Sequence, residues 1–302
     1  MNISLLKKFT LVVVLLLSGC TAVGIQRKFW AANTSVALDE EKKGNIAGAE
    51  TEYINALARA RRNNLTENLS DSLYYLGSFY ARQKRTAEAI KYLHESITVE
   101  ETLSGTNSVK TGRRVAALAN VYLMDYNLYE GRPFAERLKA IIPAFTGEER
   151  DAAAEIVDVY ERKWAASDRE LKKWKPLADQ GNAEALYVIA TMYEDGRGVE
   201  RNMNKAIELY KTSADKGFIE SQYYLGVIYD KGRGVTPDDV KARDLYRIAA
   251  EKGSAQAQYN YAVMLIQGRG GSEDKAEAAA WMKKASAQGN KAAQMWLKKN
   301  GQ

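Results

Sequence analysis

Glycine recurs in this chain at a fixed interval, and that interval limits the architectures the chain can adopt. Two series share a spacing of 36 residues; they are Gly181, Gly217, Gly253 and Gly289, and the tripeptide Gly-Arg-Gly at 196–198, 232–234 and 268–270. A regular internal period of this length indicates a protein built from stacked structural repeats.

The residues between these glycines have the pattern of paired amphipathic helices. Leu186, Ile189 and Tyr193 recur at helical spacing, and Gly-Arg-Gly then breaks the helix because glycine tolerates the left-handed conformation of a helix end. A second amphipathic segment runs to Gly217. Ordering the backbone costs ~1–2 kcal/mol per residue, and one helical hairpin buries too little apolar area to offset that cost. Neighbouring hairpins must therefore stack, which predicts an all-α solenoid.

The repeated pattern resembles the Sel1-like repeat family. The copy that matches most fully contains Ser221 to Tyr229, Gly232-Arg233-Gly234-Val235, Lys241-Ala242, Leu245-Tyr246 and Gly253. Full copies are expected at about 181–216, 217–252 and 253–288, with half repeats at both ends of a region that spans 167–302. A Ser167/Glu170 capping box is expected to start the first half repeat. The resemblance implies a right-handed α–α superhelix.

A weaker repeat occupies residues 31–146. Ala37, Gly77 and Ala119 are small residues within apolar helical patterns, 40 and 42 residues apart. In each case another small residue follows twelve positions later. This pattern resembles the tetratricopeptide repeat (TPR), with longer turns than usual. Residues 147–166 are expected to form a connecting helix between the two regions.

The N-terminus has the features of an export signal. Lys7 and Lys8 precede the apolar run Phe9 to Leu17, which is too short to span a bilayer, so residues 1–19 are predicted to be a signal peptide. The sequence Leu17-Ser18-Gly19-Cys20 resembles the lipobox of bacterial lipoproteins. The resemblance implies that Cys20 is lipidated and that 20–30 form a tether. It also implies a lipid-anchored protein of the outer membrane, facing the periplasm.

The charge distribution argues against nucleic-acid binding. The formal net charge is +6 and falls to about +4 without Lys7 and Lys8. Acidic and basic residues are interspersed, and no basic stripe with interleaved aromatic residues is present. We therefore expect a solvated helical surface and no nucleic-acid partner.

The sequence also lacks a recognisable catalytic constellation. His94 is the only histidine and Cys20 the only cysteine, so histidine-based or cysteine-based catalysis and soft-metal sites are disfavoured. His94 lies in a predicted helix, where an exposed or hydrogen-bonded structural role is the favoured interpretation. No phosphate-binding or dinucleotide-binding motif is found. We expect no enzyme activity, no cofactor and no metal.

Two sets of residues are candidates for partner binding. The first set is given by register with the tetratricopeptide groove, and ordinary surface is its alternative. It consists of Asp71, Tyr74, Ser78, Arg82, Arg113, Asn120 and Met124. The second is a 36-residue ladder of tyrosines, Tyr187, Tyr223 and Tyr259. Tyrosine suits interfaces because its ring is apolar and its tip polar, but tyrosine at helical spacing also suits a core, which is the favoured alternative.

These features predict a membrane-anchored periplasmic scaffold that binds other envelope proteins. The outer-membrane lipoprotein of alginate-type exopolysaccharide export resembles this organisation, which implies a role in assembling an export machine. Two alternatives stay open. One is direct binding of peptidoglycan or polysaccharide. The other is an enzyme acting on β-lactams or peptidoglycan, which the missing residue constellations disfavour.

Overall fold

The computed structural model describes residues 22–301, whose regular structure consists of 14 α-helices and one short 3-10 helix. No strand occurs within these residues. The predicted fold class, an all-α solenoid of helical hairpins, is confirmed. The signal peptide predicted at 1–19 and the lipidation predicted at Cys20 lie outside the described residues.

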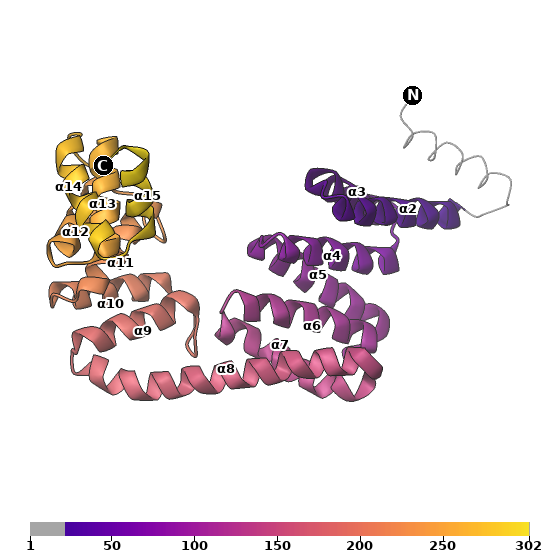
Figure 1. Ribbon diagram of the computed structural model, residues 1–302. Helices are drawn as coiled ribbons and strands as arrows, with labels where there is room; N and C mark the ends of the chain where they lie inside the picture. Colours follow the sequence, from indigo (N-terminus) through magenta and orange to yellow (C-terminus); the bar gives the residue numbers. More distant parts are fainter. Residues whose placement is uncertain (1–21, 302) are drawn as a thin grey trace, which may run out of the picture. The chain divides into compact units, whose positions relative to one another are not determined.

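The chain divides into two compact units. The first comprises residues up to Asp125 together with 131–161, and the second comprises 126–130 together with Arg162 onward. In Figure 1 the helices of the first unit run from indigo to magenta as successive hairpins. They are α2 (Ala22–Lys42), α3 (Ile46–Arg62), α4 (Thr66–Arg82), α5 (Thr86–Ser104), α6 (Val109–Met124), α7 (Leu128–Ile141) and the 3-10 helix η1 (Ile142–Ala144).

Small residues allow the helices of each hairpin in the first unit to approach closely. The predicted small residues Ala37, Gly77 and Ala119 are all buried. A Cβ atom added to Gly77 would lie 2.8 Å from Cγ of Leu93 on α5, so α4 and α5 are in direct contact there. Large apolar side chains, among them Phe79, fill the rest of this core.

A single helix, α8 (Gly147–Asp179), covers the predicted connecting helix at 147–166 and continues into the predicted half repeat. Ser167 is buried inside α8, so the expected capping box at Ser167 and Glu170 is wrong. No glycine or proline interrupts the sequence between Gly147 and Pro176, and such a run of helix-compatible residues has no reason to break. The division between the two units falls within this helix, between Glu161 and Arg162.

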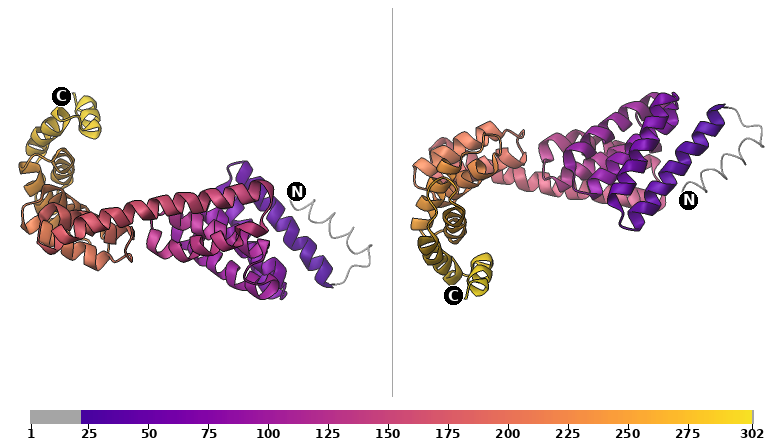
Figure 2. Two further views of the ribbon diagram at one scale, coloured as in Figure 1. Left: turned by 90° about the horizontal axis from the view of Figure 1, so that it is seen from below. Right: turned by 90° about the horizontal axis from the view of Figure 1, so that it is seen from above.

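The second unit contains three helical hairpins and a final single helix after α8. Figure 2 shows these pairs in orange and yellow, following one another along the array. They are α9 (Ala183–Asp195), α10 (Met203–Asp215), α11 (Ile219–Lys231), α12 (Asp239–Glu251), α13 (Ala255–Gln267), α14 (Lys275–Ala287) and α15 (Lys291–Lys299).

The repeated glycines end the first helix of each hairpin as the sequence predicts. Gly196, Gly232 and Gly268 are left-handed C-caps with φ of 72°, 64° and 63°. At the contact between the two helices of the second hairpin, a Cβ atom on Gly226 would lie 2.7 Å from the Tyr246 ring. Within the described residues no helix is both long and apolar enough to cross a membrane.

Candidate partner-binding groove

The first helices of the hairpins in the first unit bury one face and present another. On α4 the buried face carries Leu73 and Leu76. Tyr74, Ser78 and Arg82 follow one another at intervals of four residues, which places them on a common strip of the opposite side. The amphipathic pattern of α4 therefore fixes where these polar and aromatic side chains lie.

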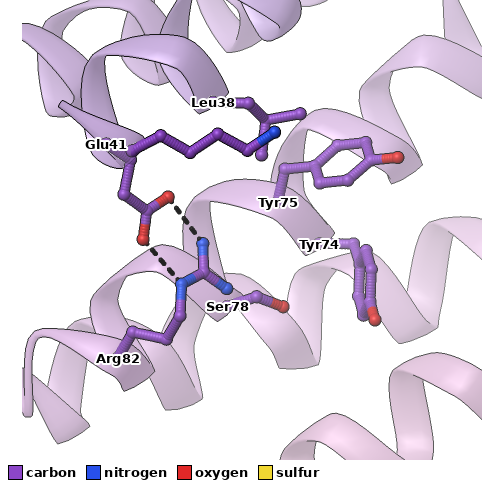
Figure 3. A pocket seen from close by; sticks show the side chains of 7 residues that line it. Leu38, Glu41, Tyr74, Tyr75, Ser78 and Arg82 are labelled. Carbon is purple, nitrogen blue, oxygen red and sulfur yellow. Dashed lines mark hydrogen bonds and ion pairs between the residues drawn. The ribbon is translucent and has the colours of Figure 1, made fainter.

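A groove lies between this strip and the C-terminal end of α2. It has a cavity volume of about 450 Å³ and is lined by Leu38, Glu41, Lys42, Tyr74, Tyr75, Ser78 and Arg82. Figure 3 shows the aromatic rings of Tyr74 and Tyr75 on one side and the paired charges of Glu41 and Arg82 on the other. We refer to these seven residues as the α2–α4 groove.

The charged side of the α2–α4 groove is held by a two-point ion pair. Nε and Nη2 of Arg82 donate to the two carboxylate oxygens of Glu41 at 2.7 and 2.9 Å. The hydroxyl of Tyr53 donates to the same carboxylate at 3.1 Å. The hydrogen bond from Arg82 lowers the pKa of Glu41, while burial and the nearby Glu41 charge raise the pKa of Tyr53 to about 12. Both groups therefore keep their protonation states at neutral pH, and α2 is tied to α4.

The aromatic side combines apolar area with polar tips. The ring centroids of Tyr74 and Tyr75 lie 5.7 Å apart, and the Arg114 guanidinium lies 5.4 Å from the Tyr74 ring centroid. Both tyrosines are half-buried, and burial raises the pKa of Tyr75. Leu38 adds an exposed aliphatic side chain across the groove. This mixture suits a protein side chain better than a small charged solute.

The structure brings together three of the seven groove residues predicted from sequence. Tyr74, Ser78 and Arg82 line the α2–α4 groove. The other four are not among its lining residues; they are Asp71 on α4 and Arg113, Asn120 and Met124 on α6. Arg113 is exposed and donates to the Glu149 carboxylate at 2.9 and 3.1 Å, which raises its pKa. Asn120 is also exposed.

The sequence prediction missed the α2 half of the groove. Leu38, Glu41 and Lys42 belong to the preceding repeat. Aligning one repeat at a time with the tetratricopeptide pattern does not show which residues of the neighbouring repeat face it. The 40-residue offset between Ala37 and Gly77 offered a usable signal, because it aligns Lys42 with Arg82 and places Glu41 beside them.

The tyrosine ladder of the second unit takes part in packing between repeats. Tyr187, Tyr223 and Tyr259 are half-buried. The Tyr187 ring lies 5.3 Å from the Phe218 ring and 5.6 Å from the Tyr224 ring, measured between centroids. Burial raises the pKa of Tyr187 and of Tyr223. These contacts give the ladder a structural role, and its role in binding stays a prediction.

The groups that could support chemistry are few. Nε2 of His94 lies 3.3 Å from the Tyr122 hydroxyl, and the imidazole packs edge-on against Phe134, which fits a structural histidine. Among the described residues no group of three or more histidine, cysteine or acidic side chains could hold a metal ion.

Comparison with known proteins places the second unit in a family. Residues 183–218, 219–254 and 255–290 each match the Sel1 repeat. A solved Sel1 repeat protein from Oxalobacter formigenes is 34% identical, over 43% of this chain and 98% of its own, with a TM-score of 0.42. The chain belongs to the Sel1 repeat family. Its three Sel1 copies begin two residues after the boundaries expected from the glycines.

Two further solved structures are similar to this chain. One is a protective antigen with an SLR fold, present in uropathogenic Escherichia coli strains. It is 19% identical over 91% of this chain and 72% of its own, with a TM-score of 0.39. The other is a Sel1 repeat protein from Klebsiella pneumoniae subsp. pneumoniae. It is 17% identical over 79% of this chain and 96% of its own, with a TM-score of 0.28. No curated protein sequence matches the chain significantly. Sel1 repeat proteins typically mediate protein–protein interactions and are generally not enzymes.

Proposed function

We propose that the protein is a lipid-anchored adaptor on the periplasmic face of the outer membrane, where its repeats bind partner proteins of an envelope complex. The lipobox-like Leu17-Ser18-Gly19-Cys20 supports the anchor. The Sel1 repeats support protein partners. A finer version, in which the complex exports a surface polymer, rests on the resemblance to lipoproteins of exopolysaccharide export. Deleting the gene should then impair secretion of that polymer, and normal secretion would reject this finer version.

The α2–α4 groove is the observation that carries the adaptor proposal. Leu38, Tyr74 and Tyr75 supply apolar area, and the Glu41–Arg82 pair supplies a fixed charged edge. Protein interfaces have this composition, with aromatic and arginine residues enriched at the centre. The ion pair also preorganises the groove, which lowers the entropy cost of binding.

Photo-crosslinking from the groove tests the proposal. A photoreactive amino acid in place of Ser78 should crosslink to a protein in intact envelopes, and Tyr74→Ala should reduce the yield about tenfold, as expected for an interface hot spot. Tyr129→Ala is the control, because Tyr129 is a surface tyrosine that does not line the groove. Crosslinks confined to lipid or glycan would reject the adaptor proposal.

A further inference from the structure

The end of the Sel1 array carries an unbalanced positive charge. Residues 278–302 contain five lysines and no acidic residue. The lysines are Lys283, Lys284, Lys291, Lys298 and Lys299. All five are exposed, and none makes an ion pair with any residue that the structure describes. By contrast, most lysines and arginines earlier in the array have an acidic partner.

Comparison by register shows that this charge combines lost acids with bases that the earlier copies lack, since Lys284 aligns with Ile248 and Lys298 with Ala262. The second helices carry a base at Lys175, Lys211, Arg247 and Lys283, each 36 residues after the last. Four positions beyond each base stand Asp179, Asp215, Glu251 and Ala287. The Lys175–Asp179 and Arg247–Glu251 pairs are both formed at 3.0 Å. Lys283 keeps the base but lacks the acid, so its charge is not compensated.

The last helix presents three of these five charges around an exposed apolar side chain, while the other two lie on α14. Lys291, Met295, Lys298 and Lys299 share one face of α15 by helical spacing, and all are exposed. Met295 is 67% exposed. Ala293 and Leu297, on the other side, are buried in the core of the array. We call the five lysines and Met295 the lysine end.

A further hairpin or a second copy of the chain does not fit on this face. Lys298 stands in the register position of Ala190, Gly226 and Ala262, where earlier hairpins need a small residue for the second helix to approach. A Cβ atom on Gly226 would already lie 2.7 Å from the Tyr246 ring. A lysine here blocks that packing, and five like charges oppose self-association.

We propose that the lysine end docks an acidic surface of a partner protein, an inference that rests on the adaptor function proposed above. Charge complementarity selects an acidic partner and speeds its encounter. Met295 at the centre with lysines around it matches an interface with an apolar core and a polar rim. A bilayer is a poorer occupant, because the apolar side of α15 faces the protein core and leaves Met295 alone to insert.

The first test maps the occupant with the full-length lipidated protein. A photoreactive amino acid replaces Gln294, which is exposed beside Met295. We expect crosslinks in intact envelopes to a protein surface rich in aspartate and glutamate, lost when Lys291→Glu and Lys298→Glu are added. Crosslinks to lipid, to glycan or to a surface without acids, or no crosslink at all, would overturn the inference. The Ser78 crosslink from the α2–α4 groove then reports separately on the adaptor proposal.

A second test measures the contribution of the lysines and Met295 with poly-L-glutamate as the probe. Lys291→Glu with Lys298→Glu should weaken binding roughly tenfold at low salt, since each surface pair contributes up to about 1 kcal/mol. Met295→Ser should weaken binding with the charge unchanged. Lys211→Glu with Lys216→Glu is the matched control of equal charge, and should leave binding within about twofold. Equal losses in both double variants, or lysine-dependent binding only to phosphatidylglycerol vesicles, would contradict the proposal.

Discussion

Arg114 is a buried charge in the first unit that has a full set of partners. Its Nε donates to the Ser70 and Ser96 hydroxyls at 2.9 and 3.0 Å. Its Nη2 lies 2.5 Å from the Asp71 carboxylate and 3.0 Å from that of Glu100. The side chains of Arg114 and Glu100 are only 4% and 3% exposed. This network joins α4, α5 and α6, and it specifies how they pack.

Removing the arginine should be costly, because the buried Glu100 carboxylate would lose its countercharge. We expect Arg114→Met to lower the free energy of unfolding by about 3–5 kcal/mol, measured by urea denaturation. Arg114→Met with Glu100→Leu should recover much of that loss. The neighbouring Arg113→Ala should cost about 1 kcal/mol or less, since the Arg113–Glu149 pair is solvent-exposed. Equal losses for the two single variants would refute this account.

The same network should make the stability of the protein depend on pH in the acidic range. Burial opposes ionisation of Glu100, but hydrogen bonds from Ser104 and Ser70 and the Arg114 charge outweigh it and lower its pKa from the ordinary value of 4.5. When a carboxyl group has a lower pKa in the folded protein than in the unfolded chain, it stabilises the fold at pH values above the unfolded-chain pKa. That stabilisation is lost as the pH falls through the pKa of the folded protein. The unfolding free energy should therefore fall below pH 4.5. Glu100→Gln should show a shallower fall; an unchanged slope would count against the assignment.

Repeated ion pairs join neighbouring elements of the second unit. The arginine of each Gly-Arg-Gly faces an acid of an earlier helix. Nη1 of Arg233 lies 3.5 Å from the Glu194 carboxylate, and Nη2 of Arg269 lies 2.6 Å from that of Asp230. Arg269 also pairs with Asp239. The loop of one repeat thus holds the preceding repeat, which is how an array with only local contacts becomes cooperative.

Arg233 and Arg269 should contribute differently to the free energy of unfolding, although they occupy the same position in successive repeats. Arg269→Ala leaves Asp230, whose side chain is only 9% exposed, with Lys231 as its remaining ion-pair partner, so we expect a loss of about 1–3 kcal/mol by thermal or urea unfolding. Arg233→Ala should cost about 1 kcal/mol or less, because the Arg233 side chain is 55% exposed. A larger loss for Arg233→Ala than for Arg269→Ala would show that burial of the acid does not determine the strength of these ion pairs.

Sequence spacing was sufficient to predict the elements whose boundaries are set by local chemistry. Gly196, Gly232 and Gly268 end helices as expected, since only glycine adopts a positive φ without strain. The junction at Ser167 was not predictable from local residues. A serine followed by a glutamate favours a helix start, but packing buries Ser167 within α8, and tertiary packing overrides a cap preference.

The sequence predicted the side of the α2–α4 groove that lies on α4, but not the side that α2 contributes. Tyr74 and Arg82 follow from the register of their own helix. Glu41 contributes only because α2 packs beside α4, and Arg113 lies on α6, where it pairs with Glu149 of α8 and does not line the groove. Contacts between residues about 36 to 41 positions apart depend on how the hairpins stack, which helical periodicity within one segment does not specify.

At the scale of the whole molecule, membrane attachment is the property to test first. Cys20→Ser should abolish incorporation of radiolabelled palmitate and move the protein from the membrane pellet to the soluble fraction, since acyl chains contribute ~0.8 kcal/mol per buried methylene. Ser78→Ala, a change in the α2–α4 groove, is the control and should leave both properties intact. Persistent labelling of the Cys20→Ser protein would eliminate the predicted anchor.

The lysine at position 298 has a consequence for how such a chain can grow. Duplicating a unit of 36 residues before it would lengthen the array and preserve its terminus, whereas adding a unit after it would place a bulky cation inside a helix–helix seam. Natural or engineered length variants should therefore carry their insertions upstream of α15. A designer who wants an open-ended filament would begin by changing Lys298 to alanine.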